Sequence, residues 1–127
     1  MNAYITDIEK KTLSNEFFRE VLYTSQHNQL VVMCLQPKEE IGEEVHEIVD
    51  QFLRIESGVG KAIIEGEEHE IRDGTALIIP AKTKHNIINT SDTEKMKLYT
   101  LYSPAHHKDK TIHKSKKDAE ADTSDHI

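Results

Sequence analysis

The sequence predicts an all-β fold in which eight to ten short strands form a sandwich or a barrel, and three observations support this. Short runs of aromatic and β-branched residues recur along the chain. Turn signals separate these runs about every 8 to 12 residues, a spacing typical of sandwiches and barrels. Outside the two ends, no segment sustains a helical apolar period, so we expect little helix. The expected strands lie at 17–24, 29–35, 51–56, 61–64, 69–72, 76–79, 84–90 and 96–103.

Turn and strand-breaking residues bound most of these strands. Residues 25–28 read as the turn of a hairpin between the first two strands. Pro37 ends the second strand, because proline cannot donate a hydrogen bond to a β-ladder. A second hairpin is expected to turn at 65–67. The run at 76–79 is apolar throughout, and it predicts a short strand that is fully buried.

Length, charge and cysteine content narrow the class of protein. A chain of 127 residues suits one domain, here a polar arm at 1–15, a β-domain at 16–104 and a polar tail at 105–127. The net charge of −7 and the lack of a basic patch with aromatics argue against a nucleic-acid partner. No apolar run resembles a signal peptide or a membrane span, so we expect no membrane partner and a cytoplasmic location. Cys34 has no second cysteine to pair with, and we expect it to fill the core with Met33.

Two sequence stretches place histidines beside glycine turns. In the second stretch Gly74, Pro80, His85 and Asn89 stand in the order G-x5-P-x4-H-x3-N. This pattern resembles the second motif of the cupin family. The family's further glycine, two residues after the proline, is Lys82 in this chain.

The first stretch is similar to the other cupin motif, G-x5-H-x-H-x3-4-E-x6-G. Aligning on Gly58 places Gln51 where the family has its glutamate, His46 at the second histidine and Glu44 at the first. The leading glycine of the motif falls on Lys38. With His85 from the second motif, the resemblance implies a metal-ligand set of Glu44, His46, Gln51 and His85.

Side-chain parity refines this set. Glu44 and His46 point the same way if the segment is extended, because side chains in a strand alternate. Gln51 joins them only through a turn or bulge at 48–50, and a turn that falls one residue differently offers Asp50 instead. Parity with Gln51 and His85 predicts four further side chains inside the barrel: Leu53, Ile55, Ile87 and Asn89.

The resemblance to small single-domain cupins covers roughly 28–104 and implies a double-stranded β-helix, or jelly-roll barrel, often as a homodimer. Two imidazoles and one carboxylate suit a divalent first-row ion, with iron, manganese, nickel and zinc as the candidates. We therefore weigh two functions. One is a metal-dependent enzyme of isomerase or oxygenase type acting on a small organic metabolite. The other is a non-catalytic module that binds a small ligand, as a sensor for example.

The tail from 105 onward carries four histidines among charged residues. His106, His107 and His113 would form a second metal site or a lid over the barrel mouth if the tail folds back. The polarity of the tail favours the simpler interpretation that these histidines are exposed. His27 and His69 have no motif around them, and we assign them no role.

Overall fold

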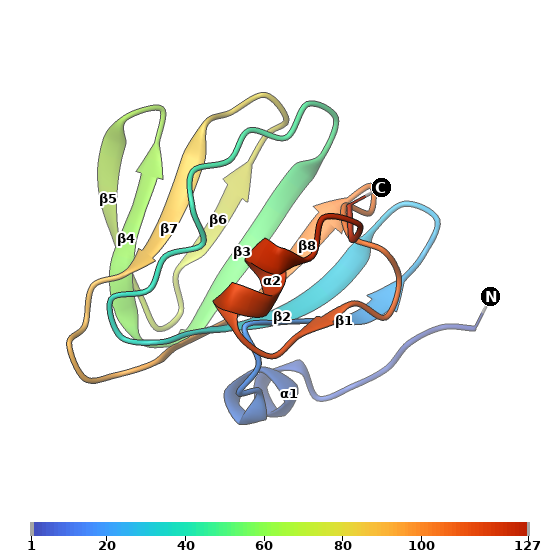
Figure 1. The fold of residues 1–127 in the computed structure, drawn as a ribbon, viewed down its shortest axis with the longest axis horizontal. Helices are drawn as coiled ribbons and strands as arrows, with labels where there is room; N and C mark the ends of the chain where they lie inside the picture. The colour runs from blue at the N-terminus through green and yellow to red at the C-terminus, as the bar shows by residue number, and fades with distance from the viewer. Residues whose placement is uncertain (1, 127) are drawn as a thin grey trace.

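The structure, a computed structural model, describes residues 2–126 and confirms the all-β jelly-roll prediction (Figure 1). The strands are β1 (Arg19–Thr24), β2 (Gln29–Leu35), β3 (Asp50–Ser57), β4 (Val59–Ile64), β5 (Glu67–Arg72), β6 (Ala76–Ile79), β7 (His85–Asn89), β8 (Met96–Ser103) and β9 (Ile112–His113). Two short helices, α1 (Ile8–Ser14) and α2 (Lys116–Ala121), lie near the chain ends. Within the described residues no helix is long and apolar enough to cross a membrane.

The strands form two antiparallel sheets with the orders β6-β3-β8-β2-β1-β9 and β5-β4-β7. The three-stranded sheet lies to one side in Figure 1, and the six-stranded sheet extends across to the N-terminal hairpin. The loop between β2 and β3 runs antiparallel to β7 and extends the smaller sheet, with bridges from Glu40 to Ile88 and from Glu44 to His85. We call the end of the barrel where this loop places Glu44 beside His85 the mouth.

The core follows the predicted parity. Leu53, Ile55 and Asn89 are fully buried, and Ile87 is nearly so, at 1% exposed. Cys34 is free and buried, as expected. Alternation along strands therefore predicts the interior of the barrel correctly.

The backbone takes the left-handed conformation at positions where the two motifs place glycine. Gly58 has φ +118°, and a Cβ there would lie 2.9 Å from the Cα of Met96. Lys38 and Lys82, which stand where the family has glycine, have φ values of +66° and +70°. A non-glycine residue rarely adopts such values. At both positions a lysine therefore adopts a backbone conformation that favours glycine.

Two sequence-based expectations are wrong. The strand at 76–79 is not fully buried: Ile78 is 75% exposed and only Ile79 is buried. The reason is that side chains alternate along β6, and Ile78 lies on the outward face of the sheet, in register with Phe52 of β3. The tail histidines are not exposed as a group, since His107 and His113 are 1% and 3% exposed. The tail adds β9 to the larger sheet and packs α2 against the core through Ala119.

Candidate metal centre

Glu44 and His85 are held opposite each other by the backbone. The Glu44 N–H donates to the His85 carbonyl at 2.8 Å, and the His85 N–H donates to the Glu44 carbonyl at 2.9 Å. The Nδ1 of His85 lies 2.9 Å from the carbonyl of Thr83, which fixes the ring orientation. The pairing of this loop with β7 therefore brings the two motifs together.

His46 stands at the centre of the site. Its Nε2 lies 3.3 Å from the Oε2 of Glu44, as their shared parity predicts. Its ring centroid lies 5.2 Å from that of His85 and 4.4 Å from that of His106. The turn after β6 supports this position, because the N–H of Lys82 donates to the His46 carbonyl at 2.6 Å.

Gln51 is buried in β3, and its neighbour Asp50 is not. The Nε2 of Gln51 donates to the hydroxyl of Thr100 at 3.0 Å. Asp50 is exposed, and its carboxylate accepts from the N–H of Ala81 at 2.8 Å. The structure therefore places the side chain of Gln51 in the interior and that of Asp50 at the surface.

The Nε2 of His46 and the Oε1 of Gln51 are buried and make no well-formed hydrogen bond: the Oε2 of Glu44 lies 3.3 Å from the Nε2, but the two are not aligned as donor and acceptor. Buried polar atoms nearly always have a partner, and an orphaned one costs about 1–3 kcal/mol. A nitrogen lone pair, an amide oxygen and the adjacent carboxylate of Glu44 are donors that suit a first-row divalent cation. The residues present therefore fit a metal ion.

His106, which sequence reasoning left in the tail, enters this site. One donor atom each from Glu44, His46 and His106 lies within 4.8 Å of the others. Among residues 2–126, His85 belongs to no such group of three donors, although its ring stands beside that of His46. The signal available in the sequence was the density of histidines after residue 105.

Gln29 holds the backbone that carries His106. The Oε1 of this buried β2 residue accepts from the N–H groups of His106 and His107 at 3.2 and 3.0 Å. Its Nε2 donates to the carbonyl of His107 at 2.7 Å. One side chain of the barrel thus anchors the start of the C-terminal segment over the mouth.

The imidazoles of His46 and His106 favour their neutral form. Burial lowers the pKa of His46, against the opposing effect of the Glu44 carboxylate. Burial, reinforced by the charge of a protonated His46, lowers the pKa of His106 to about 3. A neutral imidazole keeps a lone pair for a metal ion or a hydrogen-bond donor.

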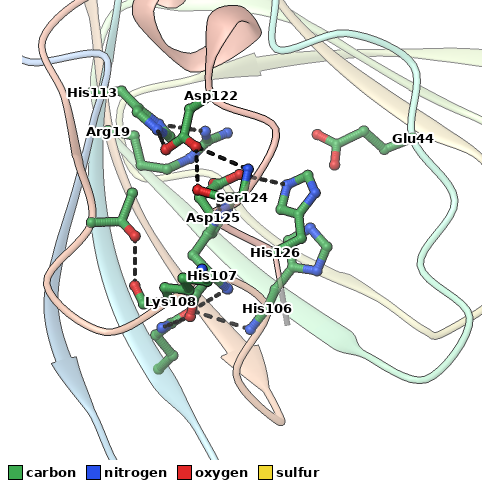
Figure 2. A network of polar contacts seen from close by, with 12 residues as sticks. Arg19, Glu44, His106, His107, Lys108, His113, Asp122, Ser124, Asp125 and His126 are labelled. Atoms are coloured by element: carbon green, nitrogen blue, oxygen red, sulfur yellow. Dashed lines mark hydrogen bonds and ion pairs between the residues drawn. The ribbon is translucent and has the colours of Figure 1, made fainter.

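A cavity of about 290 Å³ opens beside the site. It lies between α2 and the loop that carries Glu44, and its lining includes Glu44, His126 and Arg19. Arg19 is 7% exposed, and its buried Nε has no partner. Its guanidinium also contacts the Nδ1 of His113 at 3.1 Å, within the polar network drawn in Figure 2. The lining carries both signs of charge, since Glu44, Glu120 and Asp125 stand against Arg19 and Lys116, so only the part of the cavity beside Arg19 suits a small anion.

The family model for the cupin domain matches residues 31–102, which contain both motifs and most of the two sheets. The chain belongs to the cupin family. The matched range ends before His106, so the C-terminal segment that closes the site lies outside the part shared with the family model.

Individual relatives resemble a larger share of the chain. An uncharacterised protein of Acanthamoeba polyphaga mimivirus is 45% identical over 83% of this chain and 68% of its own length. The protein YrkC of Bacillus subtilis is 40% identical over 93% of this chain and 66% of its own length. The chain thus spans about two thirds of the length of these curated relatives. The crystal structure of BH2720 from Bacillus halodurans, 37% identical, has a TM-score of 0.92 and covers 95% of this chain and 96% of its own. The likeness to this structure therefore extends over nearly the whole chain.

Proposed function

We propose that this cupin binds a divalent metal ion at the barrel mouth and acts there on a small organic acid. The observation that carries the proposal is the pair of buried, unpartnered atoms, His46 Nε2 and Gln51 Oε1, beside the Glu44 carboxylate. His46, Glu44 and Gln51 would hold the ion together with His85 from β7 and His106 from the C-terminal segment. Iron(II) or manganese suits such a mixed set of nitrogen and oxygen donors.

The ion would supply a Lewis acid that polarises an oxygen of the substrate. The residues of the chain bind and orient. Arg19 offers a guanidinium for a carboxylate, and Glu44, which lines the same cavity, leads to His46 behind it. The cavity of about 290 Å³ limits the ligand to a small molecule. His106 of the C-terminal segment packs against the ring of His46, which is 8% exposed.

A manganese titration tests the metal centre. Chelator-treated protein is titrated with Mn²⁺ while free Mn²⁺ is followed by electron paramagnetic resonance. We expect one bound equivalent, which is lost in His46→Ala and Glu44→Ala and retained in His69→Ala, whose side chain is exposed on β5. Folded wild-type protein that binds no divalent ion would refute the metal centre.

The second candidate function is a non-catalytic ligand-binding module. The observation that favours it is the closure of the mouth by His107 and Asp125, both nearly fully buried, which leaves the cavity beside Arg19 as an approach to Glu44. A panel of small carboxylates separates the two functions. Metal-dependent turnover supports the enzyme, whereas saturable binding that is weakened by Arg19→Gln without any turnover supports the module.

The homodimer expected from the resemblance is also part of the proposal. An apolar row crosses neighbouring strands on the outward face, where Phe52 is registered with Ile78 and Leu101, and Leu101 with Leu30. Ile78 is 75% exposed on the edge strand β6. Pairing of two copies through β6 would cover the unpaired edge of this strand and the exposed side chain of Ile78. Sedimentation analysis should find a wild-type dimer and an Ile78→Glu monomer; a monomeric wild type would refute the homodimer.

The cytoplasmic location stays a prediction.

A further inference from the structure

Three histidines of the C-terminal segment meet where the end of the chain folds back. His107 and His126 are directly opposed in an antiparallel bridge, and the N–H of Lys108 donates to the carbonyl of Asp125. His106 stands beside both. One donor atom each from His106, His107 and His126 lies within 4.8 Å of the others. Backbone pairing, not chance proximity of exposed side chains, brings these rings together.

The spacing of the rings is close to that of imidazoles around one ion. Their centroids lie 4.4 Å apart for His106 and His126, 4.7 Å for His106 and His107, and 5.1 Å for His107 and His126. Three imidazoles bound tetrahedrally through Zn–N bonds of about 2.0–2.1 Å place their ring centres roughly 5 Å apart. The donor atoms, which lie within 4.8 Å of one another, would approach to roughly 3.3 Å around zinc, and the exposed His126 ring, whose Nε2 lies 3.6 Å from the Oδ1 of Asp125, would turn toward the ion.

The ring of His107 is held in an orientation that suits metal binding through its Nε2. Its Nδ1 lies 2.6 Å from the Oδ2 of Asp125, and both residues are buried. The carboxylate accepts the Nδ1 proton, so the Nε2 carries the lone pair. That Nε2 is buried and has no hydrogen-bond partner. A carboxylate on the far nitrogen of a metal-binding histidine orients the ring and raises its basicity.

We propose that His106, His107 and His126 form a second metal site, which takes zinc and ties the C-terminal segment over the barrel mouth. Three imidazoles with an open fourth position are a zinc-binding set, whereas manganese favours the oxygen donors found around Glu44. His106 belongs to both donor groups. An imidazole has two ring nitrogens, so His106 can serve the two ions through different atoms.

The third donor group of the structure, His113, Asp122 and Asp125, does not compete for this role. The Nε2 of His113 is already bonded to the Oδ2 of Asp122 at 3.0 Å, and its Nδ1 faces the guanidinium of Arg19 at 3.1 Å. Figure 2 shows this network beside the three-histidine cluster. A fixed cation within hydrogen-bond distance of a donor repels a second cation, so this group is structural.

The test removes the barrel site first, so that the two sites are read separately. In a Glu44→Ala/His46→Ala background, chelator-treated protein is titrated with Zn²⁺ in competition with a metal indicator. We expect one equivalent of zinc to bind. Adding His126→Ala should weaken that binding by on the order of 100-fold or more, because even an outer partner of a metal-binding histidine is worth 10–100-fold. Adding His69→Ala should leave it unchanged.

Exposed His126 is the ligand chosen for substitution, because its removal leaves the core intact. Amide hydrogen exchange supplies a second measurement: zinc should slow exchange across residues 105–126 in the background protein and not after His126→Ala. If the background protein fails to fold by circular dichroism, the same comparison is made in wild-type protein, where His126→Ala should bind one zinc equivalent fewer. A folded background protein that binds no zinc, or zinc binding indifferent to His126→Ala, overturns the proposal while leaving the manganese result at Glu44 and His46 unaffected.

Discussion

The barrel and the C-terminal segment both deliver histidines to one mouth, but they hold them by different forces. In the barrel, β-ladders fix His85, and a core of fully buried side chains such as Leu53 supports it. In the segment, His107 is held by Asp125 and by the amide of Gln29. Periodic apolar burial leaves a pattern in the sequence, whereas a buried polar network does not. This difference explains which half of the site the sequence could predict.

We expect the largest loss of stability from a substitution that removes a side chain from the core of the barrel. Leu53→Ala removes a fully buried side chain of β3, and such changes cost about 2–5 kcal/mol. We expect urea unfolding to show this loss for the whole molecule in one transition. Ile78→Ala on neighbouring β6 is the control, since its side chain is 75% exposed and should cost far less at a protein concentration that keeps both variants monomeric.

Asp125→Ala should produce a smaller loss of a different kind. It leaves the buried Nδ1 of His107 without its partner at 2.6 Å, and an orphaned buried donor costs about 1–3 kcal/mol. Since polar contacts dominate in this segment, we expect local opening: amide exchange accelerates across 105–126 while β3 keeps its protection. Equal acceleration in both regions would mean that the segment and the barrel unfold as one unit, which would remove the distinction between them.

Acid should lower the unfolding free energy of the chelator-treated protein through His106 and His46, whose pKa values are lowered in the folded state. The pKa of His106 lies near 3 when folded and near 6.5 when unfolded. Between these values the unfolded chain binds a proton that the folded chain does not, so stability falls as pH decreases through this window. Each such histidine contributes a slope of up to about 1.4 kcal/mol per pH unit.

Substitutions show how much of this pH dependence comes from His106 in the C-terminal segment and how much from His46 in the barrel. Denaturant midpoints measured from pH 7 down to 4 should depend less steeply on pH in His106→Asn and in His46→Asn, whose pKa is also lowered by burial. His27→Asn, in the exposed turn between β1 and β2, should match wild type. A slope unchanged by His106→Asn would indicate that this ring is not buried in solution.

Particular residues show where sequence reasoning succeeded and where it could not. The interior positions of β3 and β7 follow from the covalent alternation of a strand, and the closeness of Glu44 and His46 follows from the same rule. The exposure of Ile78 depends on which face of β6 points away from the core, and the uniformly apolar run ALII does not record this. His106 depends on Gln29, a residue 77 positions away, through a side-chain contact that no periodicity records.

We expect the smallest effect from Lys82, which stands where the second motif has glycine. Lys82 occupies a left-handed conformation with φ +70°, which costs a side-chain-bearing residue about 1–2 kcal/mol. Glycine relieves this strain but loses about 0.5–1 kcal/mol of backbone entropy. Lys82→Gly should therefore stabilise the protein by about 0.5–1 kcal/mol in urea unfolding. Lys84→Gly is the matched control, because Lys84 is equally exposed and does not have positive φ, so glycine there should destabilise. If both substitutions destabilise, the turn that holds the His46 carbonyl is stabilised by the lysine side chain and not merely by its backbone shape.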